Sequence, residues 1–258
     1  MKKTLSITIL LAMLCALLSG CGAQSEPEGE GISVVATVFA PYDFARQLVG
    51  ERGEVTLLLP PGSEAHSYEP SPKDIIEIQN CDLFIYVGGV SDAWVSDVLE
   101  SVGGEVRTVT LMDCVELLEE EHVEGMEVDE DEHEGEIEYD EHVWTSPRNA
   151  ELICEKIAAA LCEVDPEGAE EYGTALESYC AQLDELDAAF TEVVENGVRD
   201  TVVFGDRFPL LYFAKAYGLN YYAAWPGCAD EAEPSAATVT FLIDKVKAEG
   251  IPVVFHIE

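Results

Sequence analysis

Histidines are the side chains of this 258-residue chain whose surroundings favour metal chemistry, and His66 is the first candidate. It lies in the loop at 60–72, where four prolines and one glycine leave the backbone little freedom. The loop follows the apolar run at 55–59, which predicts a buried strand, so His66 belongs at the carboxyl end of that strand. Open α/β sheets place their ligand sites at this edge, which favours metal binding; a solvent-facing histidine is the alternative.

An acidic segment at 116–141 carries two further histidines and leads directly to His142. It contains fifteen acids, no lysine or arginine, and His122 and His133. Because it has no periodic apolar face, we expect a disordered, self-repelling loop. Neutral imidazoles and carboxylates suit weak, exchangeable capture of cations, with solvation alone as the alternative. His142 stands just before a strongly helical pattern that starts at Arg148, which makes it the better candidate for a tight ligand.

The N-terminus predicts the compartment. A basic start and the apolar run at 5–18, too short for a comfortable membrane span, predict a signal peptide over 1–20. The run ends in Leu-Ser-Gly-Cys, which resembles the bacterial lipobox, so we expect Cys21 to be lipidated and to hold the protein at the outer face of the cell membrane. Residues 21–31 then form a flexible tether. An ordinary signal peptide with an incidental cysteine is the alternative.

Composition narrows the choice of partners. The net charge of -39 repels phosphates, which argues against nucleic acid as a partner and suits cations. The six cysteines after Cys21 form no Cys-x-x-Cys pair, so a structural zinc site is not indicated. An extracytoplasmic location permits disulfides, whose pairing the sequence leaves open; small buried apolar side chains are the alternative.

Alternating strand and helix patterns predict an α/β fold in two parts. In the first part, 32–147, a mostly parallel sheet with helices on both faces is expected, with strands at 32–38, 54–59, 81–87 and 106–111. A helical segment at 148–197 follows, and the pattern that Pro166 opens, with no further proline until Pro209, predicts one long helix. The second part, 198–258, has expected strands at 201–204, 219–224 and 252–256. Because it stops on a core strand, we expect this second lobe to be C-terminally incomplete.

Several motifs occur in a distinctive order. They are the loop at 61–72, the acidic insertion, His142-Val143-Trp144-Thr145-Ser146-Pro147, the long helix, the segment 212–219 and Glu233-Pro234-Ser235. Together with the lipobox, they resemble the metal-specific solute-binding lipoproteins of ABC importers, the zinc- and manganese-binding family. The resemblance implies two α/β lobes joined by one long rigid helix, with a divalent metal ion in the cleft between them for delivery to an ABC transporter membrane permease. The acidic, His-containing insertion favours zinc over manganese or iron.

The same resemblance implies ligands that this sequence changes. The family's third histidine falls at Arg207, which stays protonated and cannot bind a cation. An alignment shifted by one residue places Asp206 there, and the family's last carboxylate ligand falls beyond residue 258. Asp206, His256 and Glu258 lie at or just past predicted strand ends and could reach the same cleft. Surface or packed positions are the alternative for each.

Two imidazoles, from His66 and His142, and one or two carboxylates would complete a roughly tetrahedral Zn²⁺ site, with Mn²⁺ as the alternative ion. A zinc hydrolase is disfavoured because the sequence has no His-Glu-x-x-His or similar cluster, so we do not expect an enzyme. The remaining alternative is a surface lipoprotein that buffers cations or mediates cell adhesion, with the acidic segment as its functional part.

Overall fold

The computed structural model describes residues 31–63, 65–104, 106–127, 138–229 and 233–257. The predicted signal peptide and most of the tether, with Cys21, lie outside the described residues, as do His133 and Glu258. Within the described part of the chain, no helix is both long enough and apolar enough to span a bilayer.

Four parallel strands form the larger sheet. They are β1 (Ile32–Ala36), β2 (Gly53–Leu57), β3 (Leu83–Tyr86) and β4 (Thr108–Thr110), arranged in the order β2-β1-β3-β4. The chain moves to one side of β1 to form β2 and to the other side to form β3 and β4. The strand order therefore reverses between β1 and β3, and in open α/β sheets ligands bind at the carboxyl ends of the strands beside such a point.

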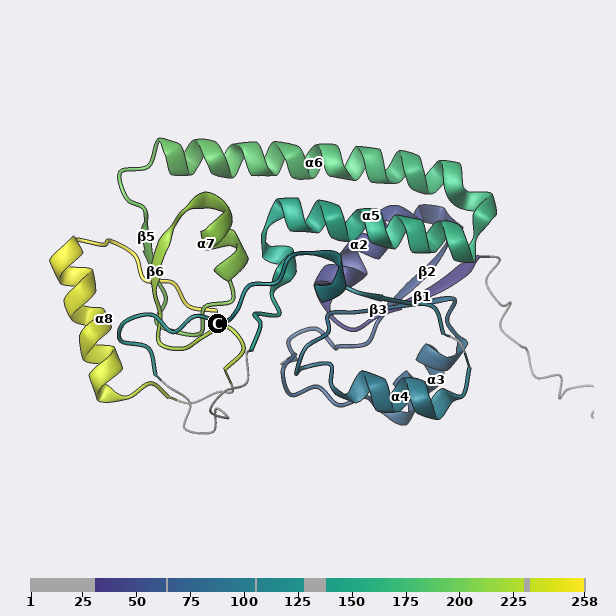
Figure 1. Ribbon diagram of the computed structural model, residues 1–258, viewed down its shortest axis with the longest axis horizontal. Helices are drawn as coiled ribbons and strands as arrows, with labels where there is room; N and C mark the ends of the chain where they lie inside the picture. The colour runs from purple at the N-terminus through teal and green to yellow at the C-terminus, as the bar shows by residue number, and fades with distance from the viewer. Residues whose placement is uncertain (1–30, 64, 105, 128–137, 230–232, 258) are drawn as a thin grey trace, which may run out of the picture. The chain divides into compact units, whose positions relative to one another are not determined.

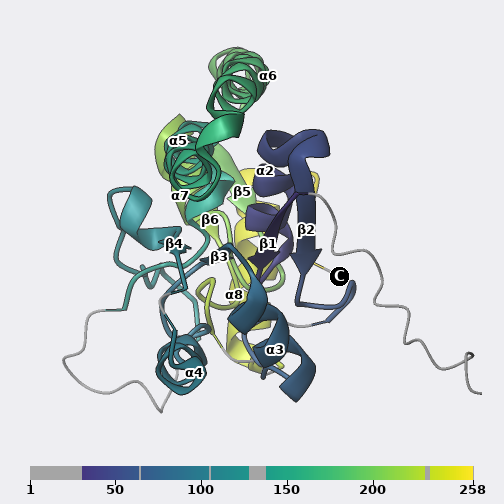
Figure 2. The ribbon, with the colours of Figure 1, turned by 90° about the vertical axis from the view of Figure 1, so that its right-hand side faces the viewer.

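Helices cover both faces of this sheet, as predicted (Figures 1 and 2). Val34 and Ala36 are buried in one core with α2 (Phe39–Val49) and α5 (Pro147–Val164). Val35 lies between them in the sequence and is buried in a separate core with α3 (Pro72–Asn80) and α4 (Trp94–Val102). This alternation follows from the two-residue period of a strand, and burial on both faces explains why the central strands β1 and β3 are rich in apolar residues.

The predicted long helix is confirmed as α6 (Ala169–Glu195), which has 27 residues. It contacts α2 of the first part, the preceding helix α5, and α7 (Leu211–Tyr217) of the second part. The Asp187 carboxylate on α6 bonds to both α5 and α7. Asp187 Oδ2 accepts from Arg148 Nη2 of α5 at 3.0 Å, and Asp187 Oδ1 accepts from Tyr217 Oη of α7 at 2.9 Å. The helix thus connects the two α/β parts through side-chain contacts as well as through the chain.

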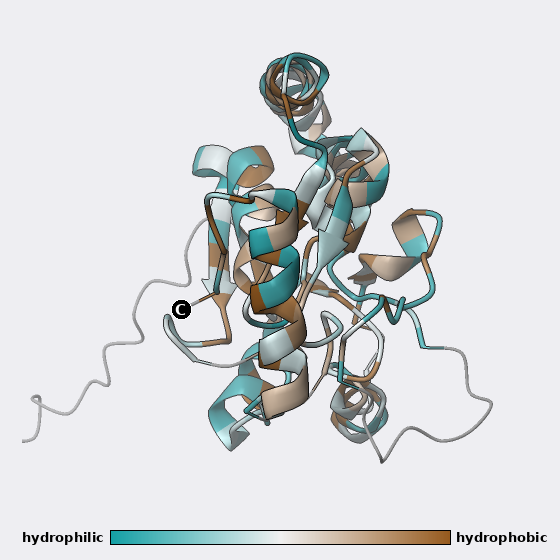
Figure 3. Ribbon diagram, turned by 90° about the vertical axis from the view of Figure 1, so that its left-hand side faces the viewer, coloured by the Kyte–Doolittle hydropathy of each residue, from teal (hydrophilic) through white to brown (hydrophobic). Residues whose placement is uncertain are grey.

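The second part contains a smaller parallel sheet. Its strands are β5 (Thr201–Val203) and β6 (Asn220–Tyr222), and α8 (Ala236–Glu249) follows, capped by the Ser235 hydroxyl. Figure 3 shows hydrophobic and hydrophilic residues alternating along α8. The strand expected at 252–256 is reduced to one parallel bridge, in which Phe255 N–H donates to Val203 O at 2.8 Å. Short 3-10 turns occur at Gly50–Arg52, Met112–Cys114, Val143–Thr145 and Pro166–Gly168.

The acidic segment is ordered at both of its ends, so the expectation of disorder throughout 116–141 is wrong for residues 116–127 and 138–141. Met126 is buried in the core of the second part. Leu118 N–H donates to Tyr212 Oη at 3.1 Å, and the same Tyr212 hydroxyl donates to Asp140 O at 3.0 Å. Scattered apolar side chains between the acids provide this packing without any helical or strand period. Residues 128–137 lie outside the described part.

Candidate metal centre

A cavity of about 100 Å³ opens at the carboxyl ends of three strands of the larger sheet. Val38 follows β1, His66 follows β2, and Ser91 and Asp92 follow β3; all four line the cavity. His142, which precedes the 3-10 turn before α5, lines it as well. The cavity therefore occupies the place where the reversal of strand order predicts a ligand site.

The loop that carries His66 is anchored at its C-terminal end. Ser71 caps α3 in a capping box with Asp74, and Pro72 occupies the first turn of the helix. Tyr68 Oη donates to Asp74 Oδ2 at 2.9 Å, which ties the loop to the same helix end. These bonds fix the backbone two residues beyond His66.

His66 itself is held from the β3 side of the cavity. Its Nδ1 lies 2.7 Å from Ser91 Oγ and 4.0 Å from Glu141 Oε2, while Glu141 Oε1 accepts the Ser91 N–H at 3.0 Å. Gly89 makes this arrangement possible because its φ is +75° and a Cβ there would collide with the Glu141 carboxylate.

The Asp92 side chain forms hydrogen bonds to the backbone of the same turn after β3. Its carboxylate is only 8% exposed and accepts the N–H groups of Val87 at 2.7 Å and Gly88 at 3.0 Å. Burial raises the pKa of Asp92 to about 6, although the two backbone hydrogen bonds oppose the shift. The charge of Glu141 adds to the increase.

His142 is buried beside His66. Its N–H donates to Asp140 Oδ1 at 2.8 Å, and its Nδ1 lies 3.3 Å from the same oxygen. The ring centroids of His66 and His142 are 5.5 Å apart. Two imidazoles that share a tetrahedral zinc ion, with Zn–N of about 2.0–2.1 Å, have centroids about 5 Å apart. The observed pair is therefore close to the spacing that a shared ion needs.

Cys228 approaches His142 from the second α/β part, in the loop that follows β6. Its Sγ lies 4.0 Å from His142 Nδ1, and its N–H donates to Glu120 Oε1 at 2.7 Å. Ligand atoms of Asp140, His142 and Cys228 all lie within 4.8 Å of one another. Burial raises the pKa of the Cys228 thiol far above its usual range, and the charges of Glu120 and Asp140 add to the shift. Burial likewise raises the pKa of Glu120.

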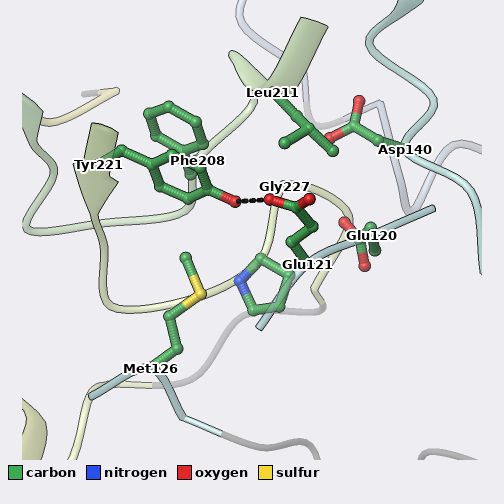
Figure 4. Close-up of a pocket in the computed structure, with 9 residues that line it drawn as sticks. Glu120, Glu121, Met126, Asp140, Phe208, Leu211, Tyr221 and Gly227 are labelled. Atoms are coloured by element: carbon green, nitrogen blue, oxygen red, sulfur yellow. Dashed lines mark hydrogen bonds between the residues drawn. The ribbon is translucent and has the colours of Figure 1, made fainter. Parts of the chain in front are cut away.

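Figure 4 shows the acidic side of this cluster, where Glu120, Glu121 and Asp140 line a small hollow with Tyr221. Glu121 Oε2 lies 3.4 Å from the Tyr221 hydroxyl, and Glu121 Oε1 forms a 2.7 Å ion pair with Lys215. Glu121 thus has a cationic neighbour on the surface, whereas Glu120 is directed to the Cys228 backbone.

Asp206, His256 and His122 are predicted ligands that the structure describes and that do not line this cavity. Asp206 accepts the N–H of Arg207 at 2.8 Å and that of Ile257 at 3.1 Å, and His256 is exposed. Among the described residues, neither Asp206 nor His256 lines the cavity of His66. His122 is also exposed. Ligand roles for these residues remain predictions, as do those of His133 and Glu258, which fall outside the described ranges.

Sequence reasoning missed five residues around the two histidines: Ser91, Asp92, Asp140, Glu141 and Cys228. Two signals could have found some of them. The Gly-Gly pair at the end of the third predicted strand places residues 91 and 92 at the same sheet edge as the His66 loop. Asp140 stands two residues before His142, a short spacing at which a carboxylate can contact a neighbouring imidazole.

Comparisons with known proteins identify the family. The family model described as zinc-uptake complex component A, periplasmic (ZnuA) matches residues 34–258. The zinc-binding lipoprotein AdcA of Streptococcus pneumoniae (strain ATCC BAA-255 / R6) is 33% identical over 260 residues, covering 100% of this chain and 51% of AdcA. The high-affinity zinc uptake system protein ZnuA of Bacillus subtilis (strain 168) is 32% identical over 272 residues, covering 100% of this chain and 82% of that protein.

Solved structures give the same result. The Zn(II)-bound ZnuA-like domain of Streptococcus pneumoniae AdcA superposes with a TM-score of 0.72 at 29% identity, covering 88% of this chain and 79% of that one. The metal-dependent lipoprotein YcdH of Bacillus subtilis gives a TM-score of 0.73 at 29% identity, with the same coverage of 88% and 79%.

The fold and these matches define the class as a two-lobed α/β protein of the solute-binding type, which confirms the predicted fold class. The chain belongs to the ZnuA family of zinc-uptake components. It spans about half the length of the AdcA relatives that it matches.

Proposed function

We propose that this chain binds a divalent transition metal ion outside the cytoplasm, most specifically Zn²⁺, and delivers it to an ABC transporter membrane permease. The observation that carries the proposal is the pair of imidazoles, His66 and His142, 5.5 Å apart at one cavity. Family membership supports zinc as the ion, as do the printed names of the relatives, which describe zinc binding or zinc uptake. The same names support a binding protein rather than a hydrolase.

The chemistry of binding follows from the contacts of each ring. In this proposal the Ser91 hydroxyl bonds His66 Nδ1, which leaves His66 Nε2 to face the ion. Both imidazoles must be neutral to donate a lone pair, so protons compete with zinc and acid pH weakens binding. The walls of the cavity are largely apolar, which limits the water that competes for the ion.

The location is proposed more finely as lipid-anchored to a bacterial cell membrane through Cys21. The lipobox-like Leu-Ser-Gly-Cys sequence supports the anchor, and the name of the AdcA relative includes the word lipoprotein. A Cys21→Ala variant should leave the membrane fraction while it keeps its affinity for zinc. Retention of that variant in the membrane fraction would argue against the anchor.

Zinc titration against a competing chelator tests the metal-binding proposal. We expect one tight site per chain in the mature protein, and a loss of at least about 100-fold in affinity in His66→Ala and in His142→Ala. His122→Ala removes an exposed histidine outside the cavity and serves as the matched control, with unchanged tight binding. Equal affinities of His66→Ala and the unsubstituted protein would overturn the site.

A further inference from the structure

We propose that Cys228 is a direct ligand of the bound zinc ion, together with His142 and Asp140, so that a thiolate from the second α/β part completes the site. This inference rests on the proposed function and adds a donor that neither the sequence pattern nor the family description assigns. The ion would then hold together the segment before α5 and the loop that follows β6.

The ligand atoms of the three residues all lie within 4.8 Å of one another, and the two separations from His142 Nδ1 are close to those around one ion. His142 Nδ1 lies 3.3 Å from Asp140 Oδ1 and 4.0 Å from Cys228 Sγ. In a tetrahedral zinc site, Zn–N and Zn–O near 2.1 Å and Zn–S near 2.3 Å give edges of about 3.4 Å for N···O and about 3.6 Å for N···S. The first distance already matches, and the second needs a shift of only a few tenths of an ångström.

The backbone next to the Cys228 thiol lies close to the Asp140 and His142 side chains. A Cβ at Gly227 would lie 2.8 Å from Asp140 Oδ2 and 3.2 Å from His142 Nδ1, so glycine lets the loop lie directly against both side chains. The Cys228 N–H is fixed by Glu120 at 2.7 Å, and Cys228 Sγ lies 3.5 Å from the Glu141 N–H, which donates to it. The sulfur therefore has a fixed position beside the imidazole.

Burial gives the cluster a reason to take up a cation. Asp140 is 1% exposed and His142 is 9% exposed, so the carboxylate is almost fully removed from water. A buried carboxylate is costly unless it is paired, hydrogen-bonded or bound to a metal ion; Asp140 accepts the His142 N–H, and a bound cation would add a partner for its negative charge. On binding, the Cys228 S–H bond breaks, the proton passes to solvent, and the sulfur lone pair forms the Zn–S bond, so each ion bound through the thiolate releases one proton from this residue.

Cobalt substitution tests the inference in the full mature chain. Co²⁺ in a site with a thiolate ligand gives a sulfur-to-metal charge-transfer band in the near ultraviolet, which histidine and carboxylate ligands do not give. We expect this band in the unsubstituted protein and in Cys114→Ser, which removes a partly buried thiol elsewhere. Cys228→Ser should lose the band and bind zinc at least about tenfold more weakly.

The two proposals fail in different ways. Loss of tight binding in His66→Ala tests the proposed function, whereas the charge-transfer band of the unsubstituted protein tests only the thiolate and does not depend on whether any variant folds. Tight, His66-dependent cobalt binding without the band would overturn the role of Cys228. The ion would then lie at the other ring nitrogen of His142, with Asp140 orienting the imidazole.

Discussion

The Ser91 hydroxyl oxygen lies 2.7 Å from Nδ1 of His66 and orients the imidazole. Ser91→Ala removes this contact with Nδ1, and the loss of such an orienting partner typically costs 10- to 100-fold in metal affinity. We expect a decrease of about this size in a chelator competition assay, with little change in melting temperature. Ser96→Ala is the control, because the Ser96 hydroxyl donates to Ala93 O on an exposed turn of α4. Equal affinities of the two variants would argue against the orienting role.

Asp92 gives a pH dependence of folding stability. Its pKa is about 6 in the folded protein against 3.8 for the ordinary carboxyl, so the folded state binds the proton more tightly than the unfolded state. The stability that the protonated carboxyl contributes is present at low pH and is lost as pH rises through about 6. Asp92→Asn keeps an acceptor oxygen for the two backbone N–H groups but cannot ionise, so it removes this pH-dependent loss of stability.

The difference in free energy of unfolding, Asp92→Asn minus unsubstituted, should therefore rise by about 2 kcal/mol between pH 4 and pH 7. Urea denaturation at a series of pH values, with chelator present, measures it. A difference that stays constant with pH would contradict the assignment.

Some residues of the candidate site could be predicted from the sequence, and others could not. His66 and His142 could be predicted as a pair because the two motifs that carry them occur in the order that resembles a metal-binding family. Cys228 could not, because a cysteine outside a Cys-x-x-Cys pair fits a disulfide or a small buried side chain equally well. Only the fold brings the loop that follows β6 against His142, 86 positions earlier.

At the scale of elements, the turn after β3 controls the shape of the site. Gly89 has a φ of +75°, and a Cβ added there would collide with the Glu141 carboxylate, whereas Gly103 has a φ of +64° with no atom within 4 Å of an added Cβ. Gly103→Ala should cost about 1–2 kcal/mol of stability from its backbone conformation alone. Gly89→Ala should cost more in urea denaturation and should also weaken zinc binding, because Glu141 and Ser91 are displaced. Equal costs and unchanged affinity would show that Glu141 does not press on this turn.

The order of helices and strands could be predicted from the sequence because short runs rich in apolar residues alternate with helical patterns that begin or end at proline or glycine. The acidic segment was not. Leu118 and Met126 lie among charges without a period, and the partners that order them, such as Tyr212, come from almost a hundred residues away. Local pattern therefore predicted disorder where long-range packing gives order.

At the scale of the whole molecule, the net charge of -39 raises the question of whether the acids or the cavity bind the metal. Replacing residues 128–137 by a short Gly/Ser linker removes His133 and six acids while it leaves the packed residues 116–127 and 138–141 in place. We expect the tight site to persist with affinity within about threefold and only weakly bound zinc to decrease, as measured by equilibrium dialysis. A scrambled segment of the same composition is the control. Loss of most tightly bound zinc would favour a cation buffer instead.

X-ray absorption spectroscopy of the zinc-loaded mature protein tests the central claim most directly. If His66 and His142 bind the ion, the spectrum should contain the multiple-scattering pattern of two imidazoles with Zn–N of about 2.0–2.1 Å, and His122→Ala should give the same pattern. A first shell of oxygen atoms without imidazole scattering, or a pattern that disappears in His122→Ala, would contradict the claim.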